Sequence, residues 1–158
     1  MPAARMGLAG TLNRNAGSYA SPTWTEITLA RDVQENLTWD EADVSDRASR
    51  IKRFAKTMLD VDFTVTVRND LTDAGYDALL TAMYSPTSAL DLLILDGPTT
   101  EVGAQGIRAD FQVMSGSQSQ SLSDGLFREF KLRVSIDANP PKIAEVTGTA
   151  TITYTEIT

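Results

Sequence analysis

Three runs of strict alternation between apolar and polar residues constrain the fold of this chain more than any other feature. Val61 to Arg68 reads Val-Asp-Phe-Thr-Val-Thr-Val-Arg, and the runs Ile107 to Val113 and Phe130 to Ile136 alternate in the same way. A period of two residues is typical of β-strands that bury one face. We therefore predict a sheet that packs one side against a hydrophobic core.

Weaker segments extend this set to about seven strands. The other predicted strands are Met6–Leu12, Val33–Val44, Leu90–Leu95 and Val146–Thr155, and Trp24–Leu29 is predicted to be extended. Glu35 and Glu41 interrupt the apolar face of Val33–Val44, which favours a partly solvated ribbon over a core strand. The turn signal Asp124-Gly125 predicts that the strands on either side of it pair antiparallel.

One amphipathic helix is predicted in the middle of the chain, from Thr72 to Tyr84. Its apolar positions follow helical spacing, Thr72 is a plausible cap, and Pro86 ends the run. The apolar positions are Tyr76, Leu79, Leu80 and Met83. The expected fold class is mainly β (α+β): a β-sandwich or open barrel with one α-helix and an extended hairpin-like loop.

A length of 158 residues predicts a single domain spanning residues 1–158. Within it we expect a flexible N-terminal arm over about residues 1–22, rich in Ala, Gly, Ser and Asn. We also expect a charged loop over about residues 40–57, in which nine side chains are charged. Such a segment is too charged to build its own core, so we predict that it is mobile in the isolated subunit and ordered on assembly.

The complete absence of histidine and cysteine narrows the possible functions. It removes Ser-His-Asp and Cys-His nucleophiles, thiolate clusters and disulfides, so we expect no enzyme, no cofactor and no metal site. Two carboxylate sets were weighed against this expectation. The cluster Asp40, Glu41, Asp43 and Asp46 lacks the order of a calcium loop, and Asp60 with Asp62 fits outward strand positions better than an acid–base pair.

The charge and hydropathy of the chain also argue against two kinds of partner, nucleic acids and membranes. A sequence pI near 4.5 and a net charge of −7 argue against a surface built to hold nucleic acid. The longest uninterrupted apolar stretch is Leu92 to Leu95, so no signal peptide or membrane span is predicted.

An acidic stretch stands directly before the only basic block. Residues 26–46 hold seven acids and one arginine, and residues 47–56 hold five cations. Complementarity between copies of the chain, or between two arms of one ribbon, explains this pattern better than phosphate binding, which stays the alternative. The predicted inter-subunit contact residues are Asp40, Glu41, Asp43, Asp46, Arg47, Arg50, Lys52, Arg53 and Lys56.

A family resemblance rests on short motifs in the first third of the chain. These are Trp24-Thr25-Glu26-Ile27 through Arg31-Asp32-Val33, then Glu41-Ala42-Asp43-Val44-Ser45 and Arg47. With the order of the predicted elements, they resemble the tail tube proteins (major tail proteins) of long-tailed bacteriophages. The basic stretch Arg50 to Lys56 departs from the Gly- and Trp-rich loop tip expected of that family.

The resemblance implies a virion structural protein of the tail, assembled in the host cytoplasm. It implies hexameric rings that stack into a hollow tube through which genome DNA passes without specific binding. The implied partners are further copies of the chain and the tail tip initiator, tape measure and tail terminator proteins, with no membrane. The alternative is a monomeric β-sandwich binding module, such as a minor tail or head-decoration protein.

Overall fold

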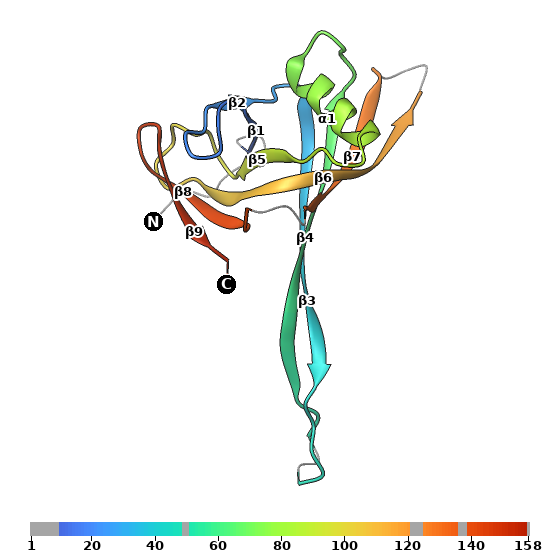
Figure 1. Cartoon of the computed structure of the whole chain (residues 1–158), viewed down its shortest axis with the longest axis vertical. Helices are drawn as coiled ribbons and strands as arrows, with labels where there is room; N and C mark the ends of the chain where they lie inside the picture. Colours follow the sequence, from blue (N-terminus) through green and yellow to red (C-terminus); the bar gives the residue numbers. More distant parts are fainter. Residues whose placement is uncertain (1–9, 49–50, 121–124, 136–138, 158) are drawn as a thin grey trace.

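Nine strands and one helix are found in the computed structural model, which describes residues 10–48, 51–120, 125–135 and 139–157 (Figure 1). The strands are β1 (Thr11–Asn15), β2 (Trp24–Glu26), β3 (Ala30–Asp43), β4 (Phe54–Arg68), β5 (Leu90–Leu95), β6 (Gln105–Ser119), β7 (Phe127–Val134), β8 (Lys142–Gly148) and β9 (Thr151–Glu156). The helix, α1, spans Ala74–Tyr84. The predicted class is confirmed: the protein is mainly β, with one helix and an extended hairpin.

All nine strands belong to one antiparallel sheet, which does not close into a barrel. The main order is β2-β1-β5-β6-β7-β4-β3. The sheet forks at β6, because Phe111–Ser119 pairs with β7 while Gln105–Arg108 pairs with β8 on the same side. The hairpin β8–β9 therefore leaves the main sheet as a separate branch (Figure 1).

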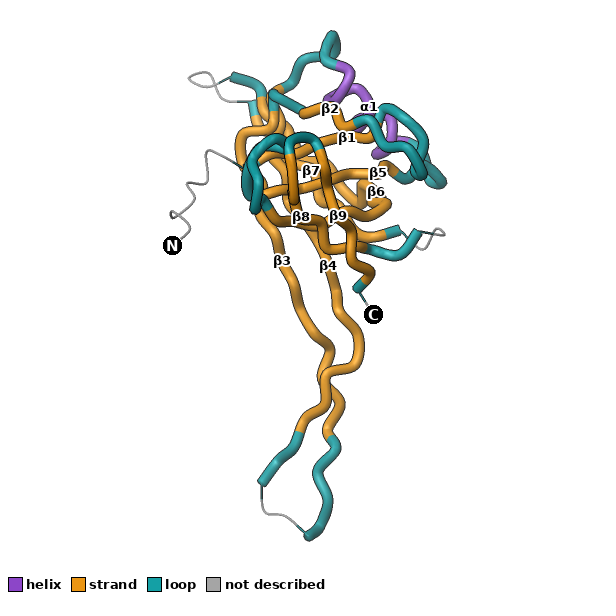
Figure 2. The backbone as a smooth tube through the Cα atoms, turned by 90° about the vertical axis from the view of Figure 1, so that its left-hand side faces the viewer, coloured by secondary structure: helices purple, strands orange, loops and turns teal. Residues whose placement is uncertain are grey.

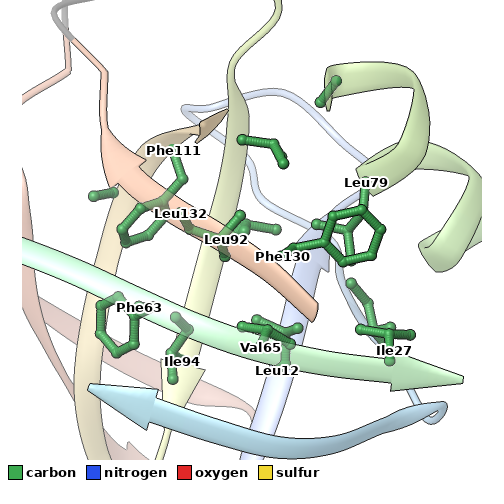
Figure 3. Close-up of a cluster of buried hydrophobic side chains, with 14 of the residues drawn as sticks. Leu12, Ile27, Phe63, Val65, Leu79, Leu92, Ile94, Phe111, Phe130 and Leu132 are labelled. Atoms are coloured by element: carbon green, nitrogen blue, oxygen red, sulfur yellow. The ribbon is translucent and has the colours of Figure 1, made fainter. Parts of the chain in front are cut away.

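The main core lies between one face of the sheet and α1 (Figure 3). Period-2 alternation places Phe63, Val65 and Val67 on this face with no solvent exposure. The ring of Phe63 meets that of Phe111 edge-on, with centroids 5.5 Å apart. From α1, Leu79 and Tyr76 close the core, and Tyr76 stacks edge-on against Phe130 at 6.1 Å.

A second, smaller core lies on the opposite face. Alternate residues of β5 point to opposite faces, so Leu92 and Ile94 join the main core while Leu93 and Leu95 join the second. The hairpin β8–β9 covers this second core through Ala144 and Val146, with Ile152 and Tyr154 packed beside them. Both faces of β5 are thus buried.

The helix is confirmed, but its predicted start and cap are wrong. Asp73, not Thr72, caps α1: its carboxylate accepts a hydrogen bond from the Tyr76 N–H at 2.8 Å. Thr72 is engaged elsewhere, because its hydroxyl and N–H both donate to the Asp70 carboxylate. These bonds lower the pKa of Asp70.

Several predicted boundaries differ from the observed ones, and three of the differences change the course of the chain. The first strand lies at Thr11–Asn15, and residues 6–9 of its predicted range fall outside the described part. The last predicted strand is a hairpin, since Ala150 takes a left-handed φ of 61° and turns the chain between β8 and β9. The predicted charged loop of residues 40–57 is shorter, because Asp40–Asp43 continue β3 and Phe54–Thr57 begin β4.

Candidate assembly interface

The outer half of the β3–β4 hairpin extends far from the rest of the molecule (Figure 2). β7 pairs with β4 only from Asp62 to Arg68, so residues 37–43 and 54–61 form a ribbon of two strands, with no third strand of the described chain beside them. We call residues 37–61 the arm. A two-stranded ribbon is marginally stable in water by itself, so this is the segment with the most to gain from a partner.

One face of the arm is apolar and exposed. Leu37, Trp39 and Phe54 retain 49%, 40% and 56% of their accessible surface. The register pairs Trp39 with Leu59, and the ammonium of Lys56 lies 5.3 Å from the centre of the Trp39 ring. The pair Glu41 and Lys56 lies between Trp39 and Phe54 along the ribbon, and exposed aromatic side chains set among charged ones are typical of a protein contact.

The predicted contact residues all fall on the arm, apart from Arg50, which lies outside the described residues. Asp40, Glu41 and Asp43 belong to the last part of β3, Lys56 lies opposite Glu41 on β4, and the other four belong to the connection between the strands. Those four are Asp46, Arg47, Lys52 and Arg53. The side chains of Arg47, Lys52, Arg53 and Lys56 form no ion pair with any described residue.

The connection at the end of the arm is closed by local hydrogen bonds. The Val44 N–H donates to the Arg53 carbonyl at 2.9 Å, and the Arg53 N–H donates to the Ser45 hydroxyl at 2.9 Å. The Ser45 N–H donates to the carboxylate of Asp43 at 2.9 Å, and the hydrogen bonds from Ser45 hold the pKa of Asp43 below its usual value. These bonds join the two sides of the connection at its base.

Asp60 and Asp62 lie on the polar face of the hairpin, where they pair with cations of β7. Arg133 lies 2.8 Å from the Asp60 carboxylate and 3.8 Å from that of Asp62, and Lys131 lies 3.9 Å from Asp62. Asn36 also donates to Asp62 at 2.9 Å. The two carboxylates therefore occupy outward strand positions, the interpretation favoured from the sequence over an acid–base pair.

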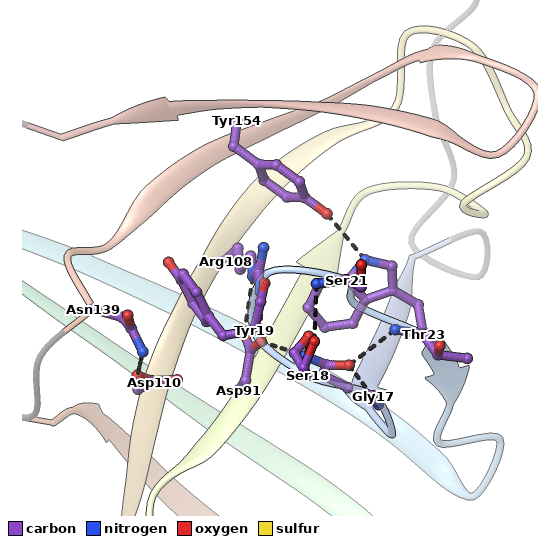
Figure 4. A network of polar contacts seen from close by, with 12 residues as sticks. Gly17, Ser18, Tyr19, Ser21, Thr23, Asp91, Arg108, Asp110, Asn139 and Tyr154 are labelled. Carbon is purple, nitrogen blue, oxygen red and sulfur yellow. Dashed lines mark hydrogen bonds and ion pairs between the residues drawn. The ribbon is translucent and has the colours of Figure 1, made fainter.

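A buried arginine links β5, the turn after β1 and the C-terminal hairpin (Figure 4). Arg108 of β6 has a side chain only 4% exposed, and it binds Asp91 of β5 through two hydrogen bonds of 3.1 and 2.7 Å. Three rings surround its guanidinium, with centroids at 4.0, 5.1 and 4.9 Å. The rings belong to Tyr19, Trp24 and Tyr154.

The surroundings of Arg108 keep it charged and tie distant segments together. Burial alone would lower the pKa of Arg108, but the hydrogen bonds and charge of Asp91 outweigh it and raise the pKa. The Trp24 indole donates to the Tyr154 hydroxyl at 3.0 Å, which links β2 to β9. Arg108 also donates to the Tyr19 carbonyl at 2.8 Å. The cluster therefore fixes the C-terminal hairpin and the turn after β1 against the sheet.

Sequence reasoning missed both the exposed apolar face and the Arg108 cluster. A signal for the first existed in the shared strand face of Leu37 and Trp39, but their pairing with β4 could not be foreseen. Arg108 gave no signal, since it occupies a polar position of an alternating run and the side chains that cover it come from both ends of the chain.

Two further findings concern the described residues only. No three acidic side chains among them gather closely enough to hold a metal ion. The one helix they contain is too short and too polar to cross a bilayer.

Solved structures of tails and tubes share this fold. A chain from the tail of an empty GTA particle, refined with C6 symmetry, superposes with a TM-score of 0.65 at 11% identity, covering 96% of this chain and 99% of that one. A chain of the SPP1 tail tube gives 0.66 at 14% identity over 83% and 76%. One from the sheath–tube complex of PVC, an extracellular contractile injection system, gives 0.63 at 8% identity over 99% and 95%.

These likenesses confirm the fold that the sequence resemblance implied. At identities of 8% to 14% they establish the fold alone. No family model and no curated protein matches the sequence.

Proposed function

We propose that this chain is a structural, non-enzymatic subunit that self-assembles into stacked hexameric rings, which form the hollow tube of a phage-type tail through which DNA passes. The observation that carries the proposal is the likeness of fold to a chain of a GTA tail, over 96% of this chain, and to a chain of the SPP1 tail tube, over 83% of it. The exposed arm and the open sheet support it physically.

Ring closure needs surfaces that bind copies of themselves. The main sheet ends in β2 on one side and β3 on the other, and an unpaired strand edge is a template for another chain. Repeating one contact around an axis closes a ring when the rotation fits. The C6 symmetry of the GTA tail supports six copies as the number in the ring.

Stacking of rings needs a second contact, and the arm is suited to supply it. Its apolar face carries Leu37, Trp39 and Phe54, and its charged residues include the nine predicted contact residues. We place these residues in the contact between rings, where burial of the apolar face stabilises the ribbon. Residues 44–53 then gain protection from hydrogen exchange when rings stack.

The net charge suits a channel for DNA. Each copy carries −7, so a ring of six carries −42. A wall of this sign repels a polyanion and keeps it from adhering as it passes. In a virion tail, assembled in the host cytoplasm, the tube would also contact a tail tip initiator at one end, a tape measure protein inside and a terminator at the other end.

Electron microscopy of the purified protein tests the proposal. At high concentration, or with a tail-tip initiator complex added, negative stain should show rings in end view and hollow tubes in side view. Class averages of the end views should have sixfold symmetry. If sedimentation finds only monomers under both conditions, the tube function is wrong, and a monomeric binding module becomes the better interpretation.

A further inference from the structure

A groove lies where two parts of the sheet that are not paired approach each other. β3, the last strand in the sheet order, comes near β1 and β5 there. Its volume is about 310 Å³. Leu12, Ile27, Phe63 and Ile94 of the main core form part of its lining, so it leads to an apolar floor. We call this cavity the seam groove.

Two carboxylates that line the seam groove have no partner in the part of the chain that the structure describes. Glu26 of β2 and Glu35 of β3 form no hydrogen bond or ion pair with any described residue. Partial burial raises the pKa of Glu35 above its ordinary value. Arg31, which also lines the groove, stacks on the Phe127 ring at 5.2 Å and lies 3.5 Å from Asp32.

The cations at the end of the arm, in turn, have no acidic partner among the described residues. Arg47, Lys52 and Arg53 are exposed and form no ion pair with a described residue. They cannot reach Glu35 of their own chain, because the arm carries them away from the body (Figures 1 and 2). Val44, the partner of Arg53, lies nine residues beyond Glu35, which is about 30 Å of strand.

We propose that the seam groove of one copy receives the end of the arm of a second copy, with Glu26 and Glu35 binding Lys52 and Arg53. This inference rests on the proposed function and names the surface that the arm contacts. The contact joins the arm of one copy to the body of another. It takes the place of a contact between two arms, in which the acids of one ribbon would face the cations of the other.

The contact has a physical consequence for the shape of the assembly. The arm and the seam groove are different surfaces, so the contact is heterologous and leaves one free arm and one free groove at the two ends. Such a contact propagates from copy to copy instead of stopping at a dimer. It builds an open-ended stack when each copy is displaced along the axis of the tube, so that the contact does not close on itself.

Charge exchange tests the pairing. The variants Glu26→Lys/Glu35→Lys and Lys52→Glu/Arg53→Glu should each raise the concentration needed for assembly by more than about a hundredfold, because like charges then face each other. A chain with all four substitutions restores opposite charges and should assemble within about tenfold of wild type. Thermal unfolding of each monomer should stay cooperative, since the changed residues are exposed.

A matched control separates the pairing from net charge. Glu129→Lys/Glu145→Lys changes two exposed carboxylates on other strands and alters the net charge by the same amount as the groove reversal. It should assemble like wild type. Equal loss of assembly in this control, or no recovery in the fourfold variant, would overturn the pairing.

Thiol cross-linking gives an independent test, because the chain contains no cysteine. Glu35→Cys and Arg53→Cys in one chain, joined by a short bismaleimide, should give a ladder of covalent multimers on a denaturing gel. Either single cysteine should give no ladder. If wild type never polymerises, the proposed function itself fails, whereas normal tubes without a ladder would refute only the groove contact.

Discussion

Arg108 and the arginines of the arm show two opposite uses of the same side chain. Arg108 is buried, bound twice by Asp91 and enclosed by three rings, so all its interactions are made within one chain. Arg47 and Arg53 are exposed and form no ion pair with a described residue. Arg108 holds the fold together, whereas Arg47 and Arg53 are available to bind another copy.

The same contrast holds for apolar side chains. Phe63 and Phe130 are fully buried in the body, whereas Phe54 of the arm keeps 56% of its surface in solvent. Stability and assembly should therefore depend on separate sets of residues. Substitutions in the body should change unfolding, and substitutions in the arm should change polymerisation.

The largest effect on stability is expected for Arg108→Ala. It leaves the carboxylate of Asp91, whose side chain is 13% exposed, without its cation, and breaking a buried pair from one side costs about 3 to 5 kcal/mol. Urea unfolding should show this loss. Arg133→Ala, which removes an exposed pair, should cost less than about 1 kcal/mol. Equal losses in the two variants would contradict the special role of the buried cluster.

A somewhat smaller loss is expected for Gly106→Ala, at the position of β6 that pairs with Leu95 of β5. A Cβ at this position would collide with the Ile94 carbonyl oxygen, which is backbone and cannot move aside. The expected cost is about 3 kcal/mol, measured by thermal and urea unfolding. Gly125→Ala is the control, because its Cβ would meet only the Phe127 ring at ordinary contact distance. A neutral Gly106→Ala would show that the body is less tightly packed than described.

The buried parts of the fold were the predictable ones. Leu90–Leu95 was predicted to the residue, and the alternating run from Val61 lies within β4, because burial of one face imposes a period of two. The start of β4 at Phe54 was missed, since around Lys56 and Thr57 no core imposes alternation and the order comes from pairing with β3.

For the candidate assembly interface, the sequence predicted only which charged residues take part. The acidic and basic blocks indicated contact residues, and the structure puts the described ones on the arm. The partner that we propose for the cations could not be predicted from the sequence, because Glu26 and Glu35 meet at the seam groove only through the packing of β1, β2 and β3. Ala150 likewise gave no turn signal, as alanine rarely takes a positive φ.

Trp39→Ala should separate assembly from stability. Trp39 is 40% exposed and its described contacts include Lys56 over its ring, so its removal should cost the monomer about 1 kcal/mol or less. Assembly should be lost at concentrations that polymerise wild type, because the apolar face of the arm is then interrupted. Unfolding and sedimentation of the same sample measure both. Normal polymerisation would mean that the exposed apolar face is not a contact.

The smallest effect is a pH dependence carried by Glu35. Burial raises its pKa in the folded protein above its ordinary 4.5, so the folded state binds its proton more tightly than the unfolded state. The resulting cost is absent below the ordinary pKa and grows as pH rises through the raised value. Glu35→Gln should therefore gain stability over wild type as pH increases through this range.

Melting temperatures of wild type and Glu35→Gln from pH 3 to pH 7, about the carboxyl range, measure the gain. Glu26, Asp96 and Arg31 also line the seam groove and are unchanged in the variant, so their titration is common to both. A difference that stays constant with pH would show that the Glu35 carboxyl is not perturbed.

Sedimentation of a chain without the arm tests the central claim most directly. Replacing residues 39–59 by Asn-Gly joins Thr38 to Asp60, which are register partners, through a two-residue turn suited to a hairpin. The core strands and the Arg108 cluster are kept. The shortened chain should unfold as cooperatively as wild type but should remain without tubes at every concentration at which wild type polymerises. Tubes of normal length from the shortened chain would contradict the assignment of stacking to the arm.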